Sequence, residues 1–584
     1  MSPNERHRTD RFRRAGIAFA VTLAVLAVWV GRFEMTHDGI SYLDMSLALL
    51  RGDWSHAING HWSPLYPWLL ALALAIVRPE PRLVFPLVHM VNFVIFLAAM
   101  AAFDFFLRQL LVYRKTAGVL LAADARRQAP DWVVVVLGYV VFIWSSLNLM
   151  GMAFVAPDLA VATCVYLAGG WLLRCRMNPE RWGAFVMLGL ALGLGYLAKA
   201  PMFPIGFVFL VVSVVPLPRL SLSGVARRAA VALIVFLCVV APLVAGFYHT
   251  KGRLMLGDSA WLNYLWHVDR LPIIHYQGEF HVFGTPTHPT RQISAAPPAY
   301  EFAGPVDATY PPWFDPAYWY AGLKPRFTIR GHLITARWSL RLYDADDALH
   351  HWMPSAVVLA LSAGFLAWRR WLSPEALRYH AAVWVPGAAA ILTFAGIHLE
   401  SRYVAPFMVL LWLGLLSGVS IPSPREARKV AMMLLTAVLV FHAAIIAVIS
   451  GRHVVEIAQD VFAPESAPPA DIPWRVASGL RRMGLEPGQR VAIIGPGIRA
   501  AYWAWLAQLK IVGEVPAWAK RDFWSADDGV RRAILERFAA AGAQAVVNQP
   551  NFRAEGHEPV VDFSSMGWRR IGDTEYYVLL LFKK

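Results

Sequence analysis

Six ionisable side chains stand beside long apolar runs, and their types suit a reaction on a phosphate-linked substrate. They are Asp38, Asp158, Lys199, His398, Glu400 and Arg402. An ionisable group at membrane depth usually lines a cavity or finds a partner, because charge is costly there. Cationic side chains can bind a phosphate leaving group, and a carboxylate can activate an acceptor hydroxyl. These residue types are what transfer from a lipid-linked phosphate donor requires.

Each of these residues also has a simpler structural interpretation. Asp38 and Asp158 stand near helix starts, where an aspartate can cap the helix by accepting hydrogen bonds from free N–H groups. The lysine of "GYLAKAP", Lys199, could extend to the membrane interface. Arg402 could form an ion pair with Glu400 or with Asp158. A cap or an ion pair does not exclude a part in the chemistry.

The composition places most of the chain in a membrane. Of its 584 residues, 57% are hydrophobic and 16% are charged, and the mean hydropathy is +0.46. A soluble globular protein carries roughly 25% charged residues. The net charge is +15, but the basic residues form short clusters between apolar runs. Cytoplasmic loops of membrane proteins show that pattern, so we predict membrane lipids and no nucleic acid as partners.

Eleven apolar runs predict transmembrane helices, because about 17 to 25 such residues span a bilayer. They lie near residues 15–32, 83–107, 132–149, 156–173, 183–198, 201–217, 229–248, 352–368, 380–397, 403–420 and 430–450. The basic clusters predict a cytoplasmic N-terminus, and an odd number of spans then places the C-terminus outside. This topology puts all six ionisable side chains on the outer face.

Two outer loops are expected to lie within the transmembrane domain, residues 1–450. In the loop 33–82, "GISYLDMSLALL" predicts a helix that begins just after Asp38, with Tyr42 four residues later on the same helical face. The stretch "WSPLYPWLLALALAIV" predicts an interfacial helix. Tyr42 and Trp62 are candidates for substrate binding. The loop 249–351 is rich in proline and aromatic residues, so we expect an irregular segment that is either a packed cap or a substrate lid.

The C-terminal part has a different pattern. After a linker at 451–467, residues 468–584 alternate between strand-like and helical stretches, which predicts a small α/β domain outside the cytoplasm. Its "IIGPG" turn lacks the third glycine of a dinucleotide-binding loop. Acceptor binding or packing is the favoured role for this domain.

At these residues the chain resembles the polytopic GT-C glycosyltransferases. The resemblance is to the branch that contains the protein O-mannosyltransferases and the lipid A aminoarabinose transferase. "THDGISY" is similar to the first outer loop of that family and puts Asp38 at the catalytic acid, with Tyr42 at the motif tyrosine. "APDLAV" resembles its second outer acid, Asp158. "GYLAKAP" and "ESRYVAPF" resemble the turns that place Lys199 and Arg402 near the donor phosphate.

One position departs from the family pattern. Gly39 stands where the family has a second acid in the first loop. A paired-carboxylate role would therefore need Asp44, Asp53 or Asp158 as a substitute. A divalent metal, magnesium or manganese, bound by Asp38 is a further expectation, although one carboxylate does not define a metal site.

The resemblance implies a GT-C-like helical membrane enzyme in the plasma (inner) membrane, acting at the cell envelope. It implies inverting transfer of a hexosyl or pentosyl group from a polyprenyl-phosphate donor to a protein, lipid or glycan hydroxyl on the periplasmic side. The catalytic candidates are Asp38 and Asp158; the substrate-binding candidates are Tyr42, Trp62, Lys199, His398, Glu400 and Arg402. Two alternatives stay open: a transporter of lipid-linked sugars, which would need internal repeats or mid-membrane charges, and a scaffold whose exported domain binds a partner.

Overall fold

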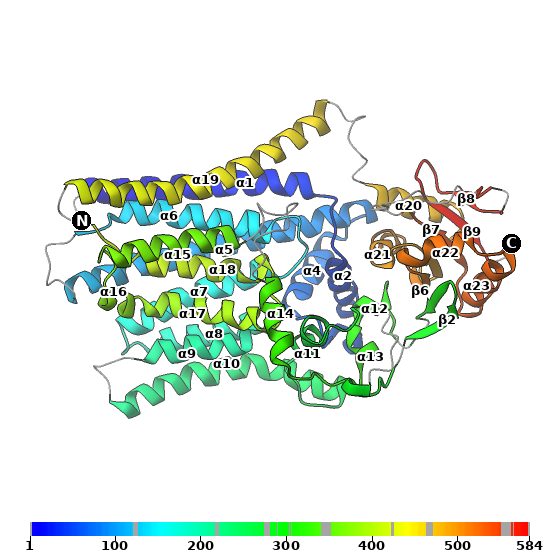
Figure 1. Cartoon of the computed structure of the whole chain (residues 1–584), viewed down its shortest axis with the longest axis horizontal. Helices are drawn as coiled ribbons and strands as arrows, with labels where there is room; N and C mark the ends of the chain where they lie inside the picture. The colour runs from blue at the N-terminus through cyan, green and yellow to red at the C-terminus, as the bar shows by residue number, and fades with distance from the viewer. Residues whose placement is uncertain are drawn as a thin grey trace. The chain divides into compact units, whose positions relative to one another are not determined.

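The structure is a computed structural model of the chain, drawn in Figure 1. It describes residues 3–120, 127–215, 221–273, 281–288, 290–302, 304, 306–339, 352–421, 425–462, 471–550, 562–564 and 566–581. The contacts divide the chain into two compact units. The first consists of Met1–Arg32, His89–Leu256 and Thr328–Ser466, and the second of Phe33–Val88, Gly257–Phe327 and Ala467–Lys584.

The first unit is helical, and a helix lies at each of the eleven positions expected from the apolar runs. These helices are α1 (Pro3–Gly31), α5 (Val84–Leu120, whose first turn belongs to the second unit), α6 (Asp131–Ile143, continued by the π-helix Trp144–Met150), α7 (Asp158–Met177), α8 (Trp182–Ala198), α9 (Met202–Val214), α10 (Leu222–Lys251), α15 (Met353–Trp368), α17 (Ala381–Ala395), α18 (Ser401–Leu416) and α19 (Arg425–Phe462). Two shorter helices, α14 (Ile329–Ser339) and α16 (Pro374–Tyr379), and a pair of two-residue strands, β1 (Arg127–Gln128) and β4 (Ser420–Ile421), complete this unit.

Six helical segments in the described part of the chain are long and apolar enough to cross a membrane. They contain α1, α5, α6, α7, α10 and α19; the helices α8, α9, α15, α17 and α18 are apolar but shorter. The expected count of eleven spans is therefore not confirmed. Helix α19 continues to Phe462 and takes up most of the expected linker at 451–467, of which residues 463–467 lie outside the described residues.

The first unit is also held together by polar contacts in its interior. Trp412 of α18 donates its indole N–H to Ser355 Oγ of α15 at 2.8 Å, and that hydroxyl lies 3.0 Å from His442 Nε2 of α19. All three side chains are buried. A buried polar group is costly unless it is hydrogen-bonded, so this chain of contacts fixes how the three helices pack.

Two helices of the second unit begin at residues that the sequence analysis had singled out. Helix α2 (His37–Leu50) starts after Thr36, whose hydroxyl accepts from Gly39 N at 3.0 Å. The N-cap is thus Thr36 and not Asp38, which lies in the first turn. Helix α4 (Leu65–Val77) follows Pro64, as the "WSPLYPW" stretch predicts. The other short helices are α3 (Trp54–Ala57), η1 (Pro81–Leu83), α11 (Ser259–Asn263), the π-helix η3 (Tyr264–Val268), η4 (His281–Phe283), α12 (Pro311–Phe314) and α13 (Pro316–Tyr320).

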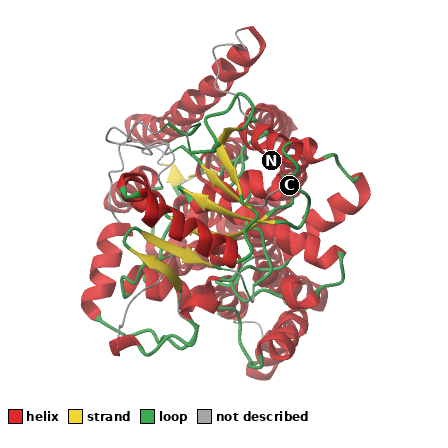
Figure 2. Ribbon diagram, turned by 90° about the vertical axis from the view of Figure 1, so that its right-hand side faces the viewer, coloured by secondary structure: helices red, strands yellow, loops and turns green. Residues whose placement is uncertain are grey.

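A seven-stranded sheet organises the C-terminal part, and its strands are yellow in Figure 2. Its order is β2 (Arg291–Ala295), β3 (Pro298–Glu301), β6 (Lys510–Val515), β5 (Arg490–Ile494), β7 (Ala545–Asn548), β9 (Tyr577–Leu580) and β8 (Arg569–Arg570). The central strand β5 runs parallel to β6 and β7, and β9 runs antiparallel to β7. The helices of this part are α20 (Ile472–Arg482), α21 (Gly497–Leu506), η6 (Ala517–Ala519), α22 (Lys520–Ser525) and α23 (Asp528–Ala540).

Strands β2 and β3 come from the long loop, which the sequence analysis expected to be irregular. That expectation is wrong for residues 291–301, because β3 pairs antiparallel with β6 through Tyr300 and Glu514. The sheet is therefore not built from residues 468–584 alone. The loop and the C-terminal part share one set of backbone hydrogen bonds.

The glycines of "IIGPG" have a structural reason in this fold. Gly495 has φ +131°, a conformation that side-chain-bearing residues rarely adopt. Gly497 begins α21 so close to β6 that a Cβ there would overlap Glu514 Oε2. The turn is thus shaped by close packing of helix on strand.

Candidate functional site

Three helix termini of the first unit bring five of the predicted site residues together. Asp158 is the first residue of α7, Lys199 lies in the break between α8 and α9, and Arg402 is the second residue of α18. The segment before α18 supplies His398 and Glu400. The helices α7, α9 and α18 begin after Pro157, Pro201 and Glu400, which stand at their N-cap positions. The polar termini then meet in space although they are up to 244 residues apart in sequence (402 − 158).

Ion pairs connect these five side chains in a continuous series. Lys199 Nζ lies 2.6 Å from Asp158 Oδ1, and Arg402 Nη1 lies 3.6 Å from Asp158 Oδ2. Arg402 Nε donates to Glu400 Oε2 at 2.6 Å, and His398 Nε2 lies 2.9 Å from Glu400 Oε1. We call these five residues the cation–carboxylate cluster. Both ion pairs that were considered for Arg402 are present.

Aromatic rings support the two cations of the cluster. The ammonium of Lys199 lies 3.5 Å from the centroid of the Tyr403 ring. The guanidinium carbon of Arg402 lies 5.1 Å from the same ring and 5.6 Å from that of Phe154. A cation over an aromatic face is stabilised by the ring quadrupole, so both cations are held in place on an apolar surface.

The cluster is graded in exposure. The Asp158 side chain is 5% exposed, whereas those of Lys199 and Arg402 are 19% and 15% exposed and that of Glu400 is 37% exposed. Asp158 is therefore the buried anchor, and the cations keep part of their surface open. Asp158 was also considered as an N-cap, but Pro157 occupies that position without a side-chain cap. The carboxylate instead binds Lys199.

Asp38, Tyr42 and Trp62 belong to the second unit. The Asp38 carboxylate accepts from the indole N–H of Trp313 at 3.2 Å, and its Oδ1 also lies 3.3 Å from His37 Nε2. Both contacts involve the same oxygen, so together they fix the orientation of the Asp38 carboxylate. Trp313 belongs to α12 in the long loop, which had been considered only as a cap or lid. No local sequence signal links residue 313 to residue 38, so this partnership could not be predicted.

Tyr42 and Trp62 lie in an aromatic core next to this carboxylate. The Tyr42 ring meets those of Trp62 and Tyr66 edge to face, with centroids 5.2 Å apart in both pairs. Trp62 donates its indole N–H to the carbonyl of Phe314 at 3.0 Å. Both side chains are buried. Their observed role is to pack α2 against α4 and the long loop, and a direct contact with substrate stays a prediction.

A half-buried histidine in this region was missed by sequence reasoning. His61 packs against the rings of Trp62 and Trp266 at 4.3 and 5.7 Å. Burial lowers the pKa of His61 to about 4, and the opposing influence of Asp38 and Asp315 is smaller. The imidazole is therefore neutral at pH 7, and within the described part of the chain its Nδ1 has no hydrogen-bond partner.

The possible substitutes for the missing second acid have other partners. Asp44 accepts from the backbone N–H and the hydroxyl of Thr309, both at 2.9 Å. Burial raises the pKa of Asp44 from 3.8 to about 6, although the two Thr309 hydrogen bonds act in the opposite direction. Asp53 caps α3 through His56 N and binds the His56 ring at 2.6 Å.

The described residues around Asp38 do not supply a set of metal ligands. Within the described residues, no three His, Cys, Asp or Glu side chains gather closely enough to hold an ion. Oδ1 of Asp38 contacts the indole N–H of Trp313 and the ring of His37, and neither contact is a metal-ligand arrangement.

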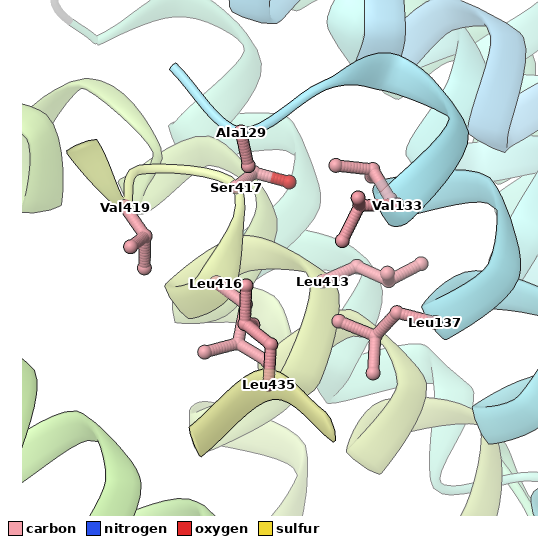
Figure 3. A pocket seen from close by; sticks show the side chains of 9 residues that line it. Ala129, Val133, Leu137, Leu413, Leu416, Ser417, Val419 and Leu435 are labelled. Carbon is pink, nitrogen blue, oxygen red and sulfur yellow. The ribbon is translucent and has the colours of Figure 1, made fainter. Parts of the chain in front are cut away.

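A separate small pocket lies in the first unit between α6, the end of α18 and α19. Figure 3 shows its lining, which includes Val133, Leu137, Leu413 and Leu435. Of the labelled side chains only Ser417 has a polar group. Because no lining residue titrates or carries charge, this cavity offers packing space and no acid–base chemistry.

No protein-family model matches the chain, and no curated protein does. Several solved structures are similar to it, and two of them are oligosaccharyltransferases. An oligosaccharyltransferase from Archaeoglobus fulgidus in complex with zinc and sulfate shares 12% identity at a TM-score of 0.42, over 90% of this chain and 67% of that chain. The archaeal oligosaccharyltransferase AglB from Archaeoglobus fulgidus, in complex with an inhibitory peptide and a dolichol-phosphate, shares 11% identity at a TM-score of 0.41, over 91% and 69%. A likeness of this degree does not establish a common fold.

Proposed function

We propose that this chain is an integral membrane glycosyltransferase that transfers a sugar from a polyprenyl-phosphate donor to an acceptor hydroxyl. The observation that carries the proposal is the cation–carboxylate cluster at the helix termini of the first unit. Lys199 and Arg402 come from distant segments and lie on the same carboxylate, Asp158, at 2.6 and 3.6 Å. Two cations held on one buried anion, each with part of its surface open, are suited to a phosphate group.

In the proposed step, the acceptor oxygen bonds to the anomeric carbon while the bond from that carbon to the phosphate oxygen breaks. The electron pair leaves with the polyprenyl phosphate. Lys199 and Arg402 stabilise the negative charge that develops on this leaving group. The acceptor proton passes to the Asp38 carboxylate, which Trp313 and His37 hold by the same oxygen. Attack opposite the leaving group inverts the anomeric configuration.

Asp158, Glu400 and His398 have a supporting role in this proposal. Asp158 fixes the ammonium of Lys199, and Glu400 fixes the guanidinium of Arg402 through Nε. Arg402 still presents a planar group with several N–H donors, which matches a phosphate better than a lysine could. The active site on the outer side and the plasma membrane location are parts of the same proposal.

The proposal is tested with purified, detergent-solubilised protein, a panel of polyprenyl-phosphate sugars and a membrane extract as the source of acceptor. Mass spectrometry follows both donor loss and the sugar-modified product, for wild type and for Asp38→Asn. We expect one donor to be consumed, and we expect the rate to fall by about 10²–10⁴ in the variant, as for loss of a general base. Full activity in a folded Asp38→Asn protein would remove Asp38 from the mechanism. Absence of turnover with every donor and extract would favour a transporter or a scaffold.

A further inference from the structure

A pocket of about 200 Å³, its open mouth included, lies in the second unit beside Asp38. One wall is a stripe of helix α2, formed by His37, Ile40, Ser41 and Asp44. These positions are spaced i, i+3, i+4 and i+7, so they share one helical face. The orientation of α2 therefore presents all four side chains to the pocket, and the wall does not depend on any one of them.

The other walls come from the long loop and from the C-terminal part. Tyr310 and Trp313 line the pocket from the segment around α12, and Ile498 and Ala501 line it from α21. Helix α21 packs against α2 within the second unit. Residues from three distant parts of the sequence therefore enclose one small space.

Two of the lining residues also hold the proposed catalytic base. His37 Nε2 and Trp313 Nε1 lie 3.3 and 3.2 Å from the same oxygen, Asp38 Oδ1. A group bound in the pocket would therefore lie close to Asp38, with only the side chains of His37 and Trp313 between them. This adjacency connects the pocket with the acceptor rather than with the lipid part of the donor.

The hydrogen-bonding capacity of the walls defines what the pocket can bind. Trp313 donates its N–H to Asp38, and Tyr310 donates its hydroxyl proton to Glu514 Oε2 at 2.8 Å. Ser41 Oγ donates to the Trp313 carbonyl at 3.5 Å. These donors are committed, and Nε2 of His37 faces Asp38 Oδ1 at 3.3 Å. Each oxygen of Asp44 accepts one hydrogen bond from Thr309 and has a second lone pair for a ligand. A ligand must therefore bring its own donor.

We propose that this pocket is a subsite that binds a hydroxyl or primary ammonium group of the acceptor, so that α21 of the C-terminal part takes part in acceptor recognition. The inference rests on the proposed function, which makes Asp38 the base. The ligand group is small, because the volume of about 200 Å³ includes the open mouth of the pocket. Its apolar neighbour fits against Ile40, Ile498 and Ala501.

The test uses the full-length protein and the donor and acceptor found in the turnover assay. Ala501→Leu fills the pocket from the α21 side, and Ala533→Leu on the exposed face of α23 is the matched control. We expect Ala501→Leu to raise the acceptor KM by at least about tenfold, equivalent to about 1.4 kcal/mol of lost binding. The donor KM should change much less, and Ala533→Leu should resemble wild type.

Two small probes identify the ligand chemistry. 1-Propanol and propylammonium are added at concentrations up to and above about 0.1 M, the Kd that corresponds to about 1.4 kcal/mol. Competition with the acceptor is measured for wild type and Ala501→Leu. Competition by either probe in wild type, lost in the variant, supports the subsite and distinguishes hydroxyl from ammonium. An unchanged acceptor KM in folded Ala501→Leu overturns the inference, as does the absence of competition by both probes.

A second variant tests the inference independently in case Ala501→Leu does not fold. Asp44→Asn keeps the shape of the side chain and removes its charge, so it should raise the acceptor KM, and more strongly for an ammonium-bearing acceptor. An acceptor KM equal to that of wild type overturns the inference. If wild type consumes no donor at all, the proposed function fails, and the subsite falls with it. Donor consumption with unaltered acceptor kinetics in both variants rejects the subsite only.

Discussion

Removal of Lys199 tests whether the cation–carboxylate cluster has the energetics that its geometry implies. In Lys199→Met, Asp158 keeps a side chain that is only 5% exposed and loses a partner at 2.6 Å. Breaking a buried pair by removing one partner costs about 3–5 kcal/mol, because the other charge stays buried and uncompensated. Arg402 at 3.6 Å compensates in part. We therefore expect a loss near the lower limit, about 3 kcal/mol.

The matched double variant separates stability from function. Lys199→Met combined with Asp158→Leu replaces both charges by apolar groups, which for buried pairs is often close to neutral. Stability should return to within about 1 kcal/mol of wild type, because no charge is left unpaired between these two positions. Transfer activity should stay lost, since the cation that binds the phosphate is absent.

Thermal unfolding in detergent, followed by tryptophan fluorescence, measures this cycle. A loss of about 3 kcal/mol corresponds to a midpoint lowered by about 6 °C at roughly 2 °C per kcal/mol, the value for large domains. The double variant should unfold within about 2 °C of wild type on the same scale. If the double variant is as unstable as the sum of the two single variants, Lys199 and Asp158 are not coupled and the described cluster is wrong.

Further predictions concern the second unit. Because burial raises the pKa of Asp44 from 3.8 to about 6, its contribution to stability is fully present below about pH 4 and is lost as the pH rises through about 6. The difference amounts to about 3 kcal/mol, and Asp44→Asn should abolish this part of the pH dependence; equal pH profiles of wild type and variant would contradict it. Gly497→Ala should lower stability by about 1–3 kcal/mol, because the new Cβ overlaps Glu514 Oε2. Its control, Gly529→Ala in α23, has open space at the Cβ position and should be neutral or slightly stabilising in the same thermal assay.

Apolar runs and local strand patterns predicted the positions of most elements. The eleven expected helices are each present, and the strand-like stretches expected within residues 468–584 contain β5, β7 and β9. These signals are local: an apolar stretch must be buried or face lipid wherever its neighbours lie. Strands β2 and β3 were missed. They pair with each other locally, but β3 is placed in the sheet by β6, whose Glu514 lies 214 residues beyond Tyr300 (514 − 300).

The sequence predicted which residues belong to the candidate site, but it did not predict which of them contact one another. The charges beside apolar runs identified Asp158, Lys199 and Arg402, because such residues need a partner. Which partner each residue contacts depends on the tertiary structure. Sequence suggested that Asp38 and Asp158 could be N-caps, whereas Thr36 caps α2 and Asp158 binds Lys199. Trp313 could not be connected with Asp38, since nothing local to either residue encodes a contact across 275 positions.

Binding of sugar-free polyprenyl phosphate is the most direct test of the central claim, that Lys199 and Arg402 recognise the donor phosphate. Its affinity is measured for wild type, Arg402→Gln, Arg402→Lys and the control Arg32→Gln, which removes the Arg32–Asp460 ion pair elsewhere in the first unit. We predict that Arg402→Gln weakens binding by at least about tenfold, or 1.4 kcal/mol, that Arg402→Lys recovers only part of it, and that Arg32→Gln has no effect. Equal affinity of wild type and a folded Arg402→Gln protein would contradict the account.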